Sequence, residues 1–179
     1  MASTLTLDVL SKYKTRTFIE TGTSQGDGVR LALAAGFQQI YSIEVNPSLV
    51  EMNRNQFKDY GDRVRILQGD SADVLPTILS ELAEPATFWL DGHWDGGPEG
   101  RYRCPLLHEL AAIKEHPIKT HQLLIDDRRL FGVSSHQWGR EVTEAGVLEA
   151  IAAINAEYQI AYEDGFVPND IITARVLSS

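Results

Sequence analysis

The feature that most constrains the fold of this chain is a regular alternation of short apolar segments with segments of helical spacing. In the helix-like segments, apolar residues recur every three or four positions, as in amphipathic helices that cover a sheet. This order predicts an α/β fold: a doubly wound, seven-stranded sheet that is mostly parallel, with a C-terminal antiparallel strand. The expected strands cover residues 17–20, 39–44, 64–67, 86–90, 122–125, 158–162 and 171–176.

The length of 179 residues is enough for one such sheet with its helices and for little more. We therefore expect a single domain over residues 1–179, with its core at 17–176. The residues before the first strand are expected to form a loose tail. The chain has one cysteine, Cys104, so neither an internal disulfide nor a multi-cysteine zinc site is expected.

The charge of the chain bears on its partners. The formal net charge is -9, which disfavours nucleic acid and anionic membranes because both attract basic surfaces. No apolar run approaches the roughly 20 residues of a membrane span, and no signal peptide is recognised at the start. We expect a cytoplasmic protein that binds a small molecule.

Acidic residues follow all five strands of the predicted parallel part of the sheet. In such sheets, ligands bind beyond the carboxyl ends of the strands, near the point where the strand order reverses. One acid after a strand is commonly a solvated helix cap, but acids after all five strands indicate a ligand site. These residues are Glu20, Glu44, Asp70, Asp91 and the pair Asp126 and Asp127.

The first strand-to-helix turn is rich in glycine. Its sequence from Glu20 to Gly28 has the spacing G-x-x-x-G-x-G. Glycines here let the backbone approach a ligand, but the spacing is not the G-x-G-x-x-G that holds a pyrophosphate. The dinucleotide interpretation is therefore weakened. Glu44, at the end of the second strand, is placed to accept hydrogen bonds from the ribose hydroxyls of an adenosine.

Five segments in this order resemble the class I S-adenosylmethionine-dependent methyltransferases, which have a Rossmann-like fold. The resemblance covers about residues 17–176 and is greater to the metal-dependent catechol O-methyltransferase-like and macrocin-type sugar O-methyltransferases. The matching segments are Glu20-x-Gly22-x-x-x-Gly26, Ile43-Glu-Val-Asn-Pro47, Gly69-Asp-Ser71-Ala-Asp73-Val-Leu-Pro76, Phe88-Trp-Leu-Asp91-Gly-His93-Trp94 and Leu123-Leu-Ile-Asp126-Asp127.

The resemblance implies a site for S-adenosylmethionine. Gly22 and its neighbours would line the methionine part, Glu44 would hold the ribose, and the segment from Asp70 would lie beside the adenine. The implied cofactor residues are Glu20, Gly22, Thr23, Gly26, Glu44, Val45, Asp70, Ser71, Ala72, Asp91 and Trp94.

The resemblance also implies a divalent metal, Mg²⁺ or Mn²⁺, held by Asp91, Asp126 and Asp127. The donor set supports this assignment, because three carboxylates make an all-oxygen site that suits a hard cation. Three such charges without a cation would repel one another. The alternative is that Arg128 and Arg129 neutralise the last two aspartates as surface ion pairs.

The catalytic base has two candidates, His93 and Asp95. Counted from Asp91, His93 occupies the position of the base in the sugar enzymes, and a histidine suits proton transfer near pH 7. If His93 and Trp94 instead match the histidine-tryptophan pair of the catechol enzymes, both would contact adenine. Asp95 would then replace the usual catalytic lysine.

The acceptor side is expected to lie under two loops, residues 92–105 and 128–141. His108, His116 and His121, on or beside a helix, are expected at the surface. The chain has no room for the extra N-terminal helices with which related enzymes close the pocket. The acceptor site should therefore be open, and closed by the 92–105 lid, by a second subunit in a homodimer, or by a large substrate.

These observations favour an O-methyltransferase acting on a small polyhydroxylated or sugar-like molecule, assisted by a metal. A noncatalytic S-adenosylmethionine-binding or partner-binding module is the alternative, since it would need the glycine turn and Glu44 but no metal triad. A nicotinamide-dependent oxidoreductase would share the fold and the ribose acid. It would lack the pyrophosphate fingerprint and have no use for the three aspartates.

Overall fold

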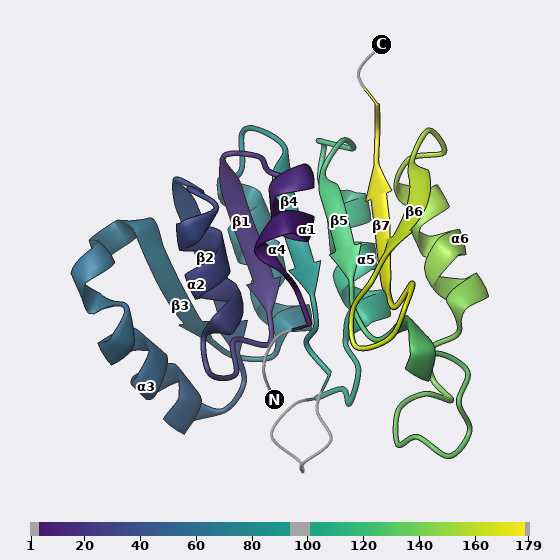
Figure 1. The fold of residues 1–179 in the computed structure, drawn as a ribbon, viewed down its shortest axis with the longest axis horizontal. Helices are drawn as coiled ribbons and strands as arrows, with labels where there is room; N and C mark the ends of the chain where they lie inside the picture. The colour runs from purple at the N-terminus through teal and green to yellow at the C-terminus, as the bar shows by residue number, and fades with distance from the viewer. Residues whose placement is uncertain (1–3, 94–100, 178–179) are drawn as a thin grey trace.

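The chain forms a seven-stranded sheet with helices on both faces (Figure 1). The computed structural model describes residues 4–93 and 101–177. The strands are β1 (Thr17–Thr21), β2 (Gln39–Glu44), β3 (Val64–Gln68), β4 (Ala86–Leu90), β5 (Gln122–Ile125), β6 (Gln159–Glu163) and β7 (Ile171–Arg175). Their order is β3-β2-β1-β4-β5-β7-β6; β1 to β5 are parallel, and β7 is antiparallel to both β5 and β6. The predicted Rossmann-like fold is confirmed.

Two groups of helices cover the two faces of the sheet. The helices are α1 (Leu7–Lys12), α2 (Asp27–Ala34), α3 (Pro47–Gln56), α4 (Ser71–Glu81), α5 (Leu106–Glu115) and α6 (Glu144–Ile154), with short 3-10 turns η1 (Lys58–Arg63) and η2 (Arg128–Leu130). The first three supply one apolar cluster, and α4 to α6 supply the other. The chain therefore crosses from one face of the sheet to the other after β3.

Successive residues of the central strands face opposite clusters. Phe18 and Trp89 pack on the side of α1 to α3, whereas their neighbours Ile19 and Phe88 pack on the side of α4 to α6. This is the period of two expected for a strand. A strand covered on both faces buries every side chain, which explains why these segments are continuous apolar runs.

Polar caps fix the start of two helices at the carboxyl edge of the sheet. The side chain of Asn46 accepts hydrogen bonds from the backbone N–H groups of Ser48 and Leu49, at 2.9 and 3.2 Å, and Pro47 occupies the first turn of α3. Asp70 accepts from the N–H of Ala72 at 3.0 Å and so caps α4. These caps hold the loops after β2 and β3 in place.

The N-terminal segment differs from the prediction of a loose tail. It forms α1, which is capped by Thr6 and packs against α2. Leu5, Val9 and Leu10 are buried in the apolar cluster on that face. A helix of six residues is too short to show a clear period, so burial rather than propensity stabilises it.

The prediction for two of the histidines was also wrong. His116, directly after α5, and His121, directly before β5, are buried, and of the three only His108 is exposed. Nδ1 of His121 accepts a hydrogen bond from the N–H of Ala86 at 3.0 Å, and its Nε2 lies 3.1 Å from Nδ1 of His116. Burial and the nearby His116 lower the pKa of His121 to about 4, so the ring is neutral near pH 7. The two buried rings are therefore partners in the core, and both nitrogens of His121 have a partner there.

In the part of the chain that the structure describes, there is no helix with both the length and the apolar character that crossing a membrane requires.

Candidate functional site

A large cavity lies beyond the carboxyl ends of the parallel strands, with a volume of about 1020 Å³. The strand order reverses between β1 and β4, so the connections after these strands diverge to opposite faces and leave a crevice between them. We divide its wall in two. The glycine-loop half follows β1 to β3 and includes Glu20, Gly22, Glu44, Asp70 and Ser71. The histidine half follows β4 and β5 and includes Asp91, His93, Asp126, Asp127 and Arg129.

Gly22 is required by the close approach of the first turn to the end of β4. Its φ is +84°, and a Cβ atom there would lie 2.4 Å from the carbonyl oxygen of Asp91. The N–H groups of Gly22 and Thr23 donate to the carbonyl of Ile43 at 2.9 and 3.2 Å, which fastens the turn to β2. A side chain at this position would push apart the two loops that form the crevice.

Glu20 is a buried carboxylate at the end of β1. The Ser42 hydroxyl donates to its Oε1 at 2.7 Å. A Cβ atom on Gly28 would lie 1.9 Å from its Oε2, so the glycine makes room for this side chain. Burial raises the pKa of Glu20 to about 8; the Ser42 hydrogen bond opposes this shift and the nearby Glu44 adds to it. A positively charged ligand would stabilise its ionised form.

Glu44 joins two loops at the end of β2. Its Oε2 accepts from the N–H of Ser24 at 2.8 Å, and its Oε1 accepts from the N–H of Asn46 at 2.9 Å. Each carboxylate oxygen can accept more than one hydrogen bond. Glu44 is therefore held by the backbone and keeps acceptor capacity for a ligand in the cavity.

Asp70 and Ser71 end the glycine-loop half. Besides capping α4, Asp70 accepts a hydrogen bond on Oδ2 from the N–H of Arg101 at 2.6 Å. Ser71 donates to Glu109 at 2.5 Å. Glu109 lies on α5 and is buried, which raises its pKa to about 7, while the hydrogen bonds from Ser71 and Thr21 oppose the rise. This acid, which contacts Ser71 of the glycine-loop half, was not predicted.

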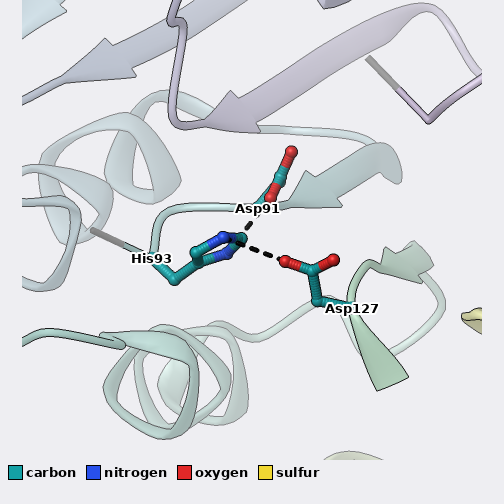
Figure 2. A group of neighbouring side chains, drawn as sticks. All are labelled: Asp91, His93 and Asp127. Atoms are coloured by element: carbon teal, nitrogen blue, oxygen red, sulfur yellow. Dashed lines mark ion pairs between the residues drawn. The ribbon is translucent and has the colours of Figure 1, made fainter. Parts of the chain in front are cut away.

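The histidine half is centred on His93, which lies between two carboxylates (Figure 2). Its Nε2 is 2.9 Å from Oδ2 of Asp127, and its Nδ1 is 3.3 Å from Oδ1 of Asp91. Desolvation raises the pKa of Asp91 well above its ordinary value, against the opposing charge of His93. Both ring nitrogens therefore face acids in this arrangement, and the contact to Asp91 is the longer one.

Asp127 has a second partner, Arg129. Oδ1 of Asp127 lies 2.5 Å from Nη1 of Arg129, which also contacts Asp170 in the β6–β7 connection. Burial acts to raise the pKa of Asp127, but the hydrogen bond from His93 and the charges of His93 and Arg129 lower it below its ordinary value. Asp127 is thus held as a carboxylate between the His93 ring and the Arg129 guanidinium.

Asp126 is held differently from its neighbour. Its Oδ2 accepts a hydrogen bond from the hydroxyl of Thr4, so the N-terminal segment reaches the cavity. Burial raises the pKa of Asp126 to about 6, the Thr4 hydrogen bond opposes the rise, and the charge of Asp127 adds to it. Asp127 has a left-handed backbone with φ of +62°, which turns the chain between these two acids.

Two groups of three side chains bring possible metal-ligand atoms within 4.8 Å of one another among residues 4–93 and 101–177. One is Asp91, His93 and Asp127, and the other is Asp126, Asp127 and Asp170. The three predicted carboxylates are divided between these groups, with Asp127 in both.

Most of the predicted site residues line the cavity. Of the predicted cofactor residues, Gly26 and Ala72 do not line it: Gly26 precedes α2 against Asn53, and Ala72 donates its N–H to Asp70. Trp94 and Asp95, together with residues 96–100 of the predicted lid, lie outside the described residues. The predicted members on its wall are Glu20, Gly22, Thr23, Glu44, Val45, Asp70, Ser71, Asp91, His93, Asp126 and Asp127.

Both predicted acceptor loops contribute to the wall, the first through Tyr102 and the second through Arg129 and His136. Thr4 and Phe166 also line the cavity and were not predicted. No periodic signal marks Thr4, and Phe166 lies in a polar turn between the last two strands. The place of Phe166 follows from the sheet order, which brings the β6–β7 connection beside the end of β5, and Thr4 is held by its hydrogen bond to Asp126.

Comparison with known proteins places this geometry in a familiar fold. No family model matches the chain, and no curated protein is significantly similar in sequence. Among solved structures, a candidate methyltransferase from Streptococcus mutans in complex with S-adenosylhomocysteine has a TM-score of 0.62 at 17% identity, over 96% of this chain and 95% of that one. The chain has the methyltransferase fold.

Two further structures show how widely this fold is used. An O-methyltransferase from Bacillus cereus in complex with S-adenosylhomocysteine has a TM-score of 0.60 at 14% identity, over 96% of this chain and 78% of that one. An rRNA methylase from Streptococcus thermophilus has a TM-score of 0.57 at 14% identity, over 96% and 94%. The methyl acceptors in these names differ, so the fold does not assign the acceptor.

Proposed function

We propose that this protein transfers a methyl group from S-adenosylmethionine to a hydroxyl of a small polyhydroxylated or sugar-like molecule. The observation that carries the proposal is that one cavity is lined both by the backbone-held carboxylate of Glu44 and by His93. A donor bound in the glycine-loop half would then present its methyl group to an acceptor in the histidine half.

The glycine-loop half suits a cationic cofactor. Glu20 and Glu44 are buried acids on this wall, and S-adenosylmethionine carries a positive sulfonium and an amino group. Glu44 would accept hydrogen bonds from the ribose hydroxyls, in the position that binds ribose in related sheets. Asp70 and Ser71 would lie beside the adenine.

The histidine half suits removal of a proton from the acceptor. The donor is already electrophilic, so catalysis requires alignment of the acceptor oxygen and a base for its proton. His93 is our candidate base. For this role one ring nitrogen must face the acceptor, and the 3.3 Å contact with Asp91 is the one more readily exchanged. Asp95 remains the alternative base.

The predicted metal ligands Asp91, Asp126 and Asp127 differ in the donor atoms that they leave available. Asp126 fits a hard cation, because its Oδ1 is buried and accepts no hydrogen bond in the described part of the chain. Asp127 does not fit, because one oxygen contacts Arg129 and the other contacts His93. The three carboxylates do not form a ready-made site, and we assign no step to a metal.

The wider assignments are proposals of the same kind. The two aspartates after β5 resemble the macrocin-type sugar branch more than the catechol branch. The net charge of -9 favours a small-molecule acceptor over RNA. A homodimer and a cytoplasmic location complete the proposal.

Calorimetry with S-adenosylmethionine and S-adenosylhomocysteine tests the first half of the proposal. Saturable binding of both is expected, and an absence of heat with either at millimolar concentration would rule it out. A parallel titration with NAD(H) should show no binding.

Transfer of a tritiated methyl group to a panel of hydroxylated small molecules tests the second half. Transfer is expected for at least one compound, with turnover lost in His93→Gln while cofactor binding persists. Cofactor binding without transfer to any compound would favour a noncatalytic binding module instead.

A further inference from the structure

The cluster formed by Asp126, Asp127 and Asp170 gathers three buried acids at the end of β5. Such a cluster needs a positive charge, because neighbouring carboxylates repel one another in surroundings of low polarity. In the structure that charge comes from the protein itself. Arg129 extends from the turn after β5 and places its guanidinium among these side chains.

Arg129 is held from several sides. Its Nη1 contacts Oδ1 of Asp127 at 2.5 Å and also Oδ2 of Asp170, while its backbone N–H donates to Oδ1 of Asp170 at 3.0 Å. The guanidinium carbon lies 4.8 Å from the ring centre of Phe166. A guanidinium fixed by two carboxylates and an aromatic face has little freedom to leave.

We propose that Arg129 is the resident cation of this acidic cluster and takes the place of a divalent metal in holding Asp127 beside His93. Only the catalytic role of His93 in this proposal rests on the proposed function. The proposal explains why one oxygen of Asp127 contacts Arg129 while the other contacts His93, and why Asp170, far along the chain, takes part in the site.

A metal ion and Arg129 compete for the same oxygen atoms. Mg²⁺ requires oxygen ligands at roughly 2.0–2.1 Å, so it would have to displace Nη1 from Asp127 and would then face the guanidinium charge. Within the described residues, Asp126 Oδ1 is the one oxygen of this cluster that is buried without a hydrogen bond, and one oxygen does not chelate. Removal of the arginine charge should therefore create a metal site.

The neighbouring Arg128 provides a matched control. Its Nε lies 2.8 Å from Oε1 of Glu144, and its guanidinium carbon lies 4.7 Å from the ring centre of Tyr162. It is not among the residues that line the cavity. Arg128→Met removes the same charge from an adjacent position without uncovering the cluster.

The test is a titration with Mn²⁺, followed by electron paramagnetic resonance of the free ion, on the full-length protein without cofactor. Wild type and Arg128→Met should show no saturable site below 1 mM, on the order of the weakest protein sites for divalent ions. Arg129→Met should bind one Mn²⁺ at least about tenfold more tightly, the effect of 1.4 kcal/mol. Asp127→Asn added to Arg129→Met should remove that gain.

Two outcomes would overturn the proposal: one saturable Mn²⁺ site in the wild type that Asp127→Asn abolishes, or no gain in a folded Arg129→Met protein. If Arg129→Met does not fold, Arg129→Lys retains a cation and should bind Mn²⁺ as weakly as the wild type; tighter binding would count against the proposal. Calorimetry with S-adenosylhomocysteine on the wild type separates the two hypotheses. Its failure would remove the proposed function and leave the Mn²⁺ result intact.

Discussion

The two halves of the cavity are held together by different kinds of contact. In the glycine-loop half, Glu44 and Asp70 are fixed by backbone N–H groups, as Glu44 is by Ser24 and Asn46. In the histidine half, side chains hold one another across long distances in the sequence, as His93 does with Asp127. The first kind of site depends on the course of the chain, whereas the second depends on the identity of each partner.

This difference suggests a division of labour within one fold. A carboxylate held by the backbone keeps its position when other side chains change, which suits a cofactor that many proteins share. A network of side chains can be rebuilt by a few substitutions, which suits acceptors that differ. The comparison predicts that changes in the glycine-loop half act on cofactor binding or folding, and that changes in the histidine half leave cofactor affinity almost intact.

The largest effect is expected from the buried acid Glu20. Its pKa of about 8 in the folded protein lies above the ordinary value of 4.5, so the folded state binds more protons than the unfolded state between these values. The contribution of Glu20 to the free energy of unfolding is therefore highest below pH 4.5, where Glu20 is protonated, and it falls as pH rises toward 8. Glu20→Gln, which stays neutral, should become more stable than the wild type by about 4 kcal/mol at pH 8.

Urea denaturation of both proteins at pH 5, 6.5 and 8 measures this difference. Glu51→Gln, at an exposed position of α3, is the control and should show no such trend. If the difference in unfolding free energy between wild type and Glu20→Gln does not change with pH, Glu20 is already ionised in the folded protein at pH 5. The assignment of a raised pKa to Glu20 would then be wrong.

Glu44→Ala should reduce the affinity for S-adenosylhomocysteine by about 100-fold, since it would remove the two hydrogen bonds that this carboxylate is proposed to accept from the ribose hydroxyls. Calorimetry at pH 7.5 provides the measurement. His93→Ala, in the opposite wall, is the matched variant and should change this affinity by less than about threefold. Equal losses in both variants would remove the proposed division between the two halves.

Gly28→Ala should destabilise the protein by about 2 kcal/mol, because its methyl group would enter the space of the Glu20 carboxylate. The denaturant midpoint is the readout. Gly146→Ala, in the first turn of α6, meets only the hydroxyl of Thr143 at 3.2 Å and should change stability by less than about 1 kcal/mol. If Gly28→Ala leaves the stability unchanged, the Glu20 side chain can move away from the added methyl group.

The smallest effect is expected for Thr4→Ala, which removes one hydrogen bond to the carboxylate of Asp126. A loss of about 1 kcal/mol in unfolding free energy is expected. Ser11→Ala, which removes an exposed hydrogen bond to Leu7 on α1, should cost less than about 0.5 kcal/mol. If Ser11→Ala lowers the free energy of unfolding as much as Thr4→Ala does, the hydrogen bond from Thr4 to Asp126 contributes no more than an exposed contact within α1. The comparison would then fail.

Much of the fold follows from local signals in the sequence. The apolar runs identify the strands, and Asn46 with Pro47 marks the start of α3, because each of these signals depends on residues close together in the chain. α1 escaped prediction since its stability comes from burial against α2. His116 and His121 look like surface residues in isolation, and only the fold shows that each satisfies the other.

The candidate site divides in the same way. Acids at strand ends could be predicted because parallel strands bring their carboxyl ends to one edge. The partners of those acids could not, since Asp170 reaches Arg129 only through the antiparallel return of β7, and Glu109 reaches Ser71 only through the packing of α5. The charged residues can be read from the sequence, but only the tertiary structure determines which of them pair with one another.

The contact between Thr4 and Asp126 has a practical consequence for handling the protein. It puts the beginning of the described chain at the mouth of the cavity, at the edge toward which the arrowheads of β1, β4 and β5 point (Figure 1). Antiparallel β7 runs away from that edge and takes the chain to the opposite edge of the sheet, where the parallel strands begin. An affinity tag or fluorophore for binding assays therefore belongs after β7, where it will not compete with the ligand.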